Sequence, residues 1–137
     1  MSSERRIARG LALQALYEID CADHRVSDVL EALLSDVELS ADNRAFCADL
    51  VKGVLSNIEL IDDEISRFAP AWPISQMALV DRAILRMSIF ELLFAKTHPV
   101  GVVINEAVEL AKAFGAEGSP RFINGVLSSV SQSVSGK

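Results

Sequence analysis

Arginine side chains on the first predicted helix have the chemistry to bind an anion, and an apolar pair follows them on the same side. At 3.6 residues per turn, one stripe of this helix collects residues at spacings of three or four, namely Arg6, Arg9, Leu13 and Tyr17. Guanidinium groups can hold phosphates bidentately, so the basic end of the stripe suits a polyanion. The apolar end suits a protein partner. The alternative, which this segment leaves open, is that another helix of the same chain covers Leu13 and Tyr17.

The opposite side of the same helix predicts a contact with a hydrophobic core. It is an apolar stripe formed by Ile7, Ala8, Leu11, Ala12, Ala15 and Ile19. The rest of the sequence spaces its apolar residues as helices do and shows no sustained period-two alternation, which predicts an all-α fold. We expect further helices over residues 26–34, 40–57, 60–68, 75–96 and 102–114, and a last one that begins at residue 119.

Polar and small residues mark the predicted helix ends. Gly115 is placed to end the helix over 102–114 in a left-handed conformation. Gly125, inside the last helix, indicates close backbone packing. Arg86, in the apolar helix over 75–96, is expected to form an ion pair with a nearby carboxylate. The candidate carboxylates are Glu91, Glu106 and Glu109, and the residues expected to cap helix N-termini are Ser27, Asp28, Ser75 and Ser119.

The clearest break in the chain is the segment that contains Pro70, Trp72 and Pro73. It divides an N-terminal half, about residues 1–70 with four helices, from a C-terminal half, about residues 74–137 with three. Each half alone is small for independent stability. We therefore predict a single domain over residues 1–137, with the apolar helix over 75–96 as its most buried element.

Composition indicates a globular protein, because half of the 137 residues are apolar and 23% are charged. The net charge of −6 counts against a general nucleic-acid binder. The arginines near the N-terminus nevertheless make a basic tip on an acidic body, which can bind RNA locally. No apolar run is long enough for a membrane span, and the N-terminus does not look like a secretion signal, so we expect a cytoplasmic protein.

The cysteines and histidines do not predict a metal, cofactor or catalytic site. Cys21 and Cys47 have neither CxxC spacing nor nearby histidines, and reduced thiols are the simplest expectation for them. Asn105 and Glu106 lack a nucleophile or a cofactor loop beside them. We therefore expect that the chain is not an enzyme.

Three segments together resemble the NusB family of bacterial transcription antitermination factors. They are RRIARGLALQALYE at the N-terminus, VDRAILRMSIFEL in the centre, and VVINEAVELAKAFGAEGSPRFINGVL near the C-terminus. The resemblance covers most of the chain except about residues 20–45, and the third segment is its most specific part. It implies an all-α fold of about seven helices in two small packed bundles.

The resemblance also implies an activity and partners. Members of the family pair with NusE, a small-subunit ribosomal protein, and the pair binds the boxA element of nascent single-stranded RNA. The complex helps RNA polymerase to read through terminators, above all in ribosomal RNA operons. A homodimer is the alternative to a monomer, since some members self-associate.

Transferred to this sequence, the resemblance implies two sets of binding residues. The set for RNA is Arg5, Arg6, Arg9, Gln14, Lys112, Glu117, Gly118, Ser119, Arg121 and Phe122. The set for the protein partner is Leu13, Tyr17, Gln76, Asp81, Arg82 and Leu85. An aromatic ring such as that of Phe122 can stack on an unpaired base, but a Phe at the edge of the core is the alternative.

Two other functions compete with antitermination. One is a protein-interaction module without RNA binding, which the acidic total charge favours. The other is an RNA-binding accessory domain of an rRNA methyltransferase that uses S-adenosylmethionine. That interpretation needs a Gly-rich α/β domain, which these 137 residues do not contain.

Overall fold

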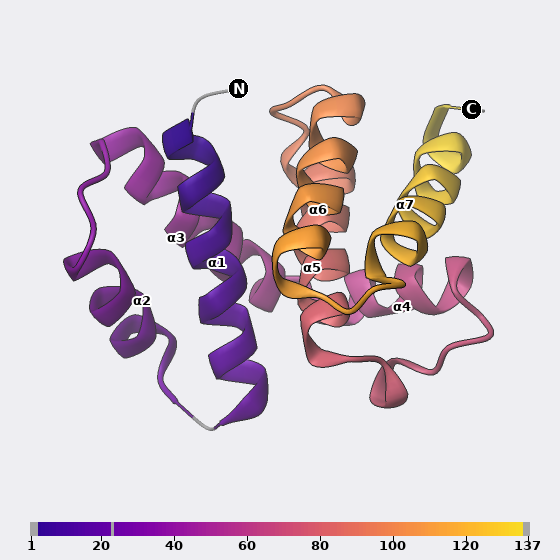
Figure 1. The fold of residues 1–137 in the computed structure, drawn as a ribbon, viewed down its shortest axis with the longest axis horizontal. Helices are drawn as coiled ribbons and strands as arrows, with labels where there is room; N and C mark the ends of the chain where they lie inside the picture. The colour runs from indigo at the N-terminus through magenta and orange to yellow at the C-terminus, as the bar shows by residue number, and fades with distance from the viewer. Residues whose placement is uncertain (1–2, 23, 136–137) are drawn as a thin grey trace. The chain divides into compact units, whose positions relative to one another are not determined.

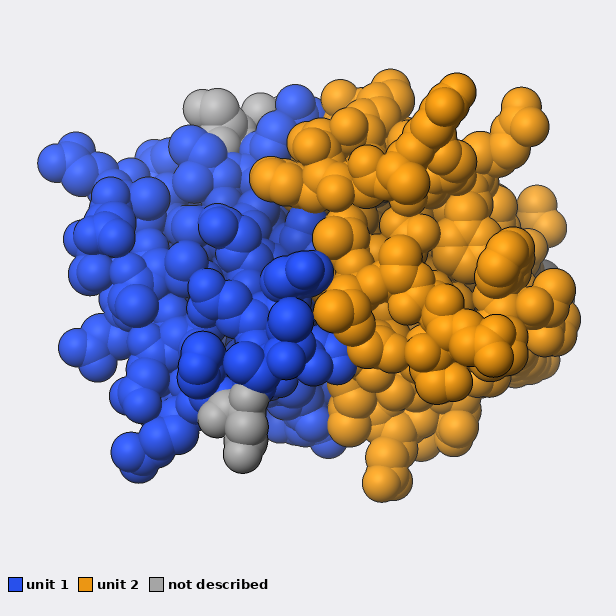
Figure 2. Space-filling model, turned by 60° about the horizontal axis from the view of Figure 1, so that its bottom comes forward, with its two compact units in different colours: residues 1–56 blue, residues 57–137 orange. Residues whose placement is uncertain are grey.

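The computed structural model describes residues 3–22 and 24–135, and over these residues the chain forms seven α-helices and no strand (Figure 1). The predicted all-α fold class is therefore confirmed. The helices divide into two compact units, residues 1–56 and residues 57–137, which Figure 2 shows in blue and orange.

The first unit contains three helices: α1 (Ser3–Cys21), α2 (Val26–Ser35) and α3 (Ala41–Ser56). Helix α1 packs against both α3 and α2, and its small residues Ala8 and Ala12 are completely buried. Two details differ from the sequence-based expectation. Ile7 is 48% exposed, and α2 begins after Arg25 without a side-chain cap. The residues expected to cap α2 lie inside the helix instead.

The second unit contains the other elements: α4 (Ile58–Phe68), the short 3₁₀ helix η1 (Ile74–Gln76), α5 (Leu79–Phe90), the π-helical turn η2 (Glu91–Ala95), α6 (Val100–Phe114) and α7 (Ser119–Ser135). Helix α5 contacts α4, α6 and α7, so the expectation of a central buried helix is confirmed. Its inward side chains are at most 2% exposed, and they are Ala83, Ile84, Leu85, Met87 and Ile89.

The boundary between the two units lies before α4. This helix packs against α5 and α7 through Ile61 and Ile65, which are fully buried. The segment with Pro70 and Pro73 is a turn within the second unit. The compact units therefore contain three and four helices, because apolar contacts rather than the prolines decide where α4 belongs.

Several predicted helix ends are wrong in detail. Ser75 lies within η1, and α5 begins after Ala78 without a side-chain cap. Gly115 has φ −93° and ψ −175°, which is extended rather than left-handed backbone, whereas Lys96 after η2 has φ 53°. A Cβ on Gly125 would meet no atom within 4 Å, so this glycine does not mark close packing.

Arg86 is held by a carboxylate that the sequence did not point to. Its Nε donates to Oδ1 of Asp62 at 2.9 Å, and its Nη2 donates to Oδ2 at 2.9 Å. This fork-to-fork pair joins α5 to α4. Asp62 lies outside the three glutamates proposed from the sequence, because only the packing of α4 on α5 brings it near.

The two thiols are free and lie in opposite environments. Cys21 is exposed, whereas Cys47 is fully buried and its pKa is raised from 9.0 to about 11 by burial. The thiolate is the reactive form, so we expect a thiol reagent at neutral pH to modify Cys21 in the native protein and Cys47 only after unfolding. Peptide mass mapping of the labelled protein measures this. Rapid labelling of Cys47 without denaturant would contradict its burial.

Candidate nucleic-acid interface

The N-terminal turns of α1 present arginines that α3 holds in place. Arg5 donates from Nε to Oδ1 of Asn43 at 2.7 Å, and its guanidinium carbon lies 4.2 Å from the ring centroid of Phe46. The guanidinium carbon of Arg9 lies 5.1 Å from the same ring, and Arg9 is only 1% exposed. Cation–π contacts of this kind orient a guanidinium group and offset part of its desolvation.

Asn43 is the centre of a polar cluster that sequence reasoning missed. Its amide nitrogen donates to Oγ of Ser40 at 2.9 Å, while the backbone N–H of Ser40 donates to Oε1 of Glu4 at 2.7 Å. Oγ of Ser40 also accepts the backbone N–H of Asn43, which caps α3. Ser40 and Asn43 are three residues apart, as in a capping box, and this spacing is the feature of the sequence that could have indicated the cluster.

The four residues of the stripe on α1 separate into two classes. Arg6 and Tyr17 are exposed, with Tyr17 at 39%, whereas Arg9 and Leu13 are buried. Of the two alternatives left open by the sequence, cover by the same chain holds for Leu13, of which only 3% is accessible, and exposure holds for Tyr17. Helix α1 contacts both α2 and α3, so less of its surface is open than on a helix packed through one side. Gln14 is exposed as well.

In the second unit, the turn between α6 and α7 is fixed by short hydrogen bonds. Oγ of Ser119 accepts the N–H of Ala116 at 3.0 Å, and the N–H of Ser119 donates to the carbonyl of Ala116 at 3.0 Å. Ser119 is the first residue of α7 and is 3% exposed, so its hydroxyl stabilises the turn rather than serving as the expected N-cap. A side chain at Gly115 would collide with Ser119, because a Cβ there lies 2.7 Å from Oγ.

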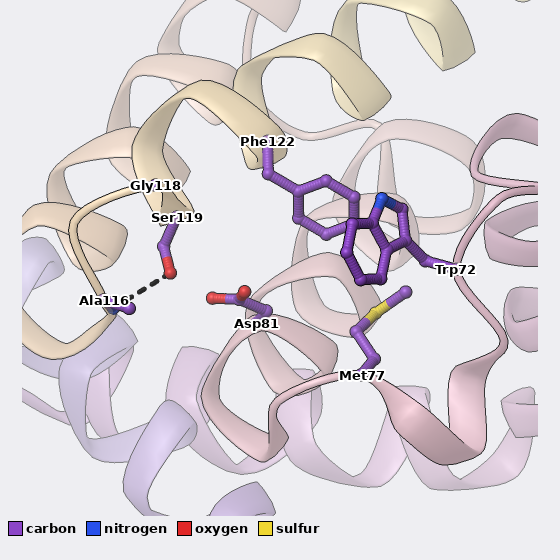
Figure 3. A pocket seen from close by; sticks show the side chains of 7 residues that line it. All are labelled: Trp72, Met77, Asp81, Ala116, Gly118, Ser119 and Phe122. Atoms are coloured by element: carbon purple, nitrogen blue, oxygen red, sulfur yellow. Dashed lines mark hydrogen bonds between the residues drawn. The ribbon is translucent and has the colours of Figure 1, made fainter.

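This turn forms one wall of a pocket of about 260 Å³ (Figure 3). The lining residues are Trp72, Met77, Asp81, Ala116, Gly118, Ser119 and Phe122. The rings of Trp72 and Phe122 meet edge to face, with centroids 6.2 Å apart and planes at 74°. Oδ1 of Asp81 is buried and has no hydrogen-bond partner among the described residues. The pocket thus combines aromatic walls with an unsatisfied acceptor.

Charged side chains surround the turn on its exposed side. Arg121 is exposed and lines a second hollow, which shares Trp72 and Phe122 with the pocket. Lys112 is exposed and forms an ion pair with Glu109, Nζ to Oε2 at 3.1 Å. The remaining predicted residues of this region, Glu117 and Gly118, are exposed.

The predicted partner residues of the second unit do not form one surface patch. Gln76 is exposed, but Leu85 is completely buried in the core. Arg82 donates from Nη1 to the carbonyl of Ile74 at 2.9 Å, which ties α5 to η1. Asp81 lies in the pocket with Ser119, a residue of the predicted RNA set.

Sequence reasoning read Trp72 only as part of a chain break and did not single out Met77. The feature of the sequence that could have indicated this site is a lone tryptophan between two prolines, since an aromatic residue in such a turn is often exposed. Trp72 is 57% exposed.

Over the described ranges, no group of three His, Cys, Asp or Glu side chains could hold a metal ion. The same residues include no helix both long and apolar enough to cross a membrane.

Comparison with known proteins places the chain among NusB proteins. The model of the NusB family matches residues 6–132. The transcription antitermination protein NusB of Dehalococcoides mccartyi strain 195 is 47% identical over 134 residues, which cover 98% of this chain and 94% of that protein. NusB of Geobacter sulfurreducens is 46% identical over 134 residues, with 97% of each chain covered.

Solved structures resemble the chain over nearly its whole length. A crystal form of T. maritima NusB has a TM-score of 0.86 and 32% identity, and it covers 96% of this chain and 93% of its own. A chain in the crystal structure of the antitermination factors NusB and NusE in complex with dsRNA has a TM-score of 0.87 and 27% identity, with coverage of 97% and 99%.

Proposed function

Because this chain belongs to the NusB family of transcription antitermination proteins, we propose that it binds boxA-type single-stranded RNA together with NusE and promotes read-through in ribosomal RNA operons. Proteins named for this family are transcription factors rather than enzymes. The proposal accordingly assigns binding roles, and no catalytic ones, to the residues of the two surfaces described above.

One observation carries the RNA-binding part of the proposal. The edge-to-face pair of Trp72 and Phe122 is flanked by the exposed Arg121 on the surface of one compact unit. Stacking on aromatic rings combined with a guanidinium for the backbone is a common way to bind single-stranded nucleic acid. Lys112, Glu117 and Gly118 extend this surface in the proposal.

The first unit adds a second RNA contact through α1. We assign direct contacts to the exposed Arg6 and Gln14, since a guanidinium can hold phosphate and an amide can read a base edge. Arg5 and Arg9, which lie over the ring of Phe46, carry positive charge beneath that surface. Their contribution is the local potential and the position of the helix end.

The partner surface in the proposal uses the exposed members of the predicted set. Tyr17 on α1 and Gln76 on η1 are exposed, and Tyr is a frequent anchor at protein interfaces. Leu13 and Leu85 are core residues here, so their truncation would act through stability. NusE is the proposed occupant because the related structure with dsRNA contains NusB and NusE.

Salt dependence of RNA binding tests the proposal. Each phosphate contact removed by mutation should reduce the slope of log K against log salt by roughly 0.7 for a single strand. We expect Arg6→Ala and Arg121→Ala each to weaken binding to a boxA-type oligonucleotide and to lower the slope by about that amount. Fluorescence anisotropy at several salt concentrations, with and without NusE, measures both effects.

Matched controls are Arg25→Ala for the first unit and Arg67→Ala for the second, because both arginines are exposed and lie outside the proposed surfaces. Neither control should change the slope. If all four variants bind RNA with the wild-type slope, the assignment of phosphate contacts to Arg6 and Arg121 fails. If the wild-type protein binds NusE but no RNA, the chain is a protein-interaction module and the RNA-binding proposal fails.

A further inference from the structure

A single aromatic ring of α3 carries two guanidinium groups of α1. The guanidinium carbons of Arg5 and Arg9 lie 4.2 and 5.1 Å from the ring centroid of Phe46. The two arginines are four residues apart, a spacing at which like charges destabilise a helix. The electron-rich face of the ring offsets part of this repulsion, because it attracts both cations. A residue of α3 therefore maintains an arrangement that α1 alone disfavours.

The position of Arg9 adds a desolvation cost to this arrangement. Only 1% of Arg9 is exposed, whereas Arg5 and Phe46 are half-buried. Removing a charge from water destabilises a fold unless other groups compensate, and an apolar residue in such a place is often at least as stabilising. Fold stability alone therefore does not explain the charge at this position. Local features that oppose stability are typical of functional sites.

Asn43 holds Arg5 from a second direction. Its Oδ1 accepts the Nε–H of Arg5 at 2.7 Å, in the plane of the guanidinium group whose face meets Phe46. Nδ2 of Asn43 donates to Oγ of Ser40 at 2.9 Å, so the amide is itself fixed at the start of α3. Because an aromatic ring and an amide are both uncharged, these two contacts orient the guanidinium of Arg5 without neutralising its charge.

We infer that α3 belongs to the RNA-binding apparatus of this protein, with Phe46 and Asn43 as positioning residues for the charges of α1. This inference rests on the proposed function. Neither residue needs to touch RNA. Two cations held at one place raise the potential that the phosphates of a single strand meet beside the exposed Arg6. Without the ring, the side chain of Arg5 would occupy many rotamers and its charge would be spread over a larger volume.

A double-mutant cycle tests whether Phe46 acts through Arg5. Phe46→Leu removes the aromatic face and keeps an apolar side chain. We expect it to raise the Kd for a boxA-type oligonucleotide roughly two- to fivefold, the factor that an ordinary cation–π contact gives. In the Arg5→Ala background it should raise the Kd by less than about twofold, because one of the charges that it positions is already gone. An equal fold-change in both backgrounds would assign Phe46 to packing alone and overturn the inference.

Two further variants separate the ring's charge interaction from its volume. Phe46→Tyr keeps the aromatic face and should bind RNA as the wild-type protein does. Phe94→Leu is the matched control in the second unit, because its ring stacks on that of Phe90, with centroids 5.9 Å apart; it should keep the wild-type Kd. The difference between the wild-type protein and Phe46→Leu should shrink as salt is raised. A tyrosine variant as weak as the leucine variant, or a difference independent of salt, would overturn the inference.

Urea denaturation and NusE binding of each variant separate positioning from loss of the fold. Phe46→Leu should keep the NusE affinity of the wild-type protein. If Phe46→Leu does not fold, Asn43→Ala takes its place in the cycle, because it removes the acceptor of the Arg5 Nε–H and keeps the ring. Wild-type RNA affinity of the folded variant would overturn the inference and leave the proposed function intact. Absence of RNA binding by the wild-type protein would overturn the proposed function and the inference with it.

Discussion

Replacement of Gly115 by alanine is expected to lower the free energy of unfolding by about 1–3 kcal/mol, the usual cost of forcing an extra methyl group into a packed site. The added Cβ would lie 2.7 Å from both Cβ and Oγ of Ser119 and 2.8 Å from the carbonyl oxygen of Ala111. Two of these three atoms cannot rotate away, because they belong to the backbone or are fixed to it. Urea denaturation followed by circular dichroism measures the loss.

The same change should weaken RNA binding beyond its effect on stability. To relieve the collision, Ser119 must move, and its hydrogen bond with the N–H of Ala116 lies within the turn that forms one pocket wall. The control is Gly101→Ala at the other end of α6, where a Cβ meets no atom within 4 Å. That control should be neutral or stabilise by up to about 1 kcal/mol. Equal stability of the Gly115→Ala variant and the wild-type protein would show that the turn is not closely packed.

Removal of the Phe122 ring is expected to have the largest effect on RNA affinity. A base–aromatic stack contributes about 1–3 kcal/mol, so Phe122→Ala should raise the Kd for a boxA-type oligonucleotide roughly 5- to 150-fold. The ring is half-buried and contacts Trp72, so part of the effect will come from the altered wall of the pocket. Anisotropy titration at fixed salt, beside a denaturation curve of each variant, separates the two contributions.

Phe114→Ala is the matched control, because Phe114 is 53% exposed and lines none of the described hollows that include Phe122. It should bind RNA as the wild-type protein does. The two variants remove the same side chain from the same unit. If Phe122→Ala and Phe114→Ala both change the Kd only slightly, Phe122 is a residue at the edge of the core and does not stack on an RNA base.

The arginines at the start of α1 show how exposure changes an interpretation based on residue type. From the sequence alone, Arg6 and Arg9 are equally good candidates to bind phosphate. In the structure, Arg9 is buried over the ring of Phe46 while Arg6 is exposed. A buried guanidinium acts at a distance through its charge, whereas an exposed one can form a bidentate contact. The loss of slope in log K against log salt is therefore expected for the Arg6→Ala variant because Arg6 is exposed.

Several properties of this protein follow from local patterns along the chain. Helical spacing of apolar residues predicted the all-α fold, because burial of one face is decided by positions three and four apart. The last helix shows this spacing in its buried residues, which are Ile123, Val126, Leu127 and Val130. Family membership was also evident from the order and spacing of three segments. The roles of the individual site residues remain predictions.

Only the tertiary structure decided which of those residues share a site and which are covered. Asp81 meets Ser119 across a pocket because α5 and α7 pack together, although the two residues are far apart in sequence. Leu13 lies opposite the predicted core stripe of α1 and is nevertheless only 3% exposed, since helical periodicity says nothing about how many neighbours a helix has. Likewise, Gly115 is required by a side chain four residues further along rather than by its own backbone angles. Local sequence determines which face of a helix is apolar, but long-range packing determines what lies against it.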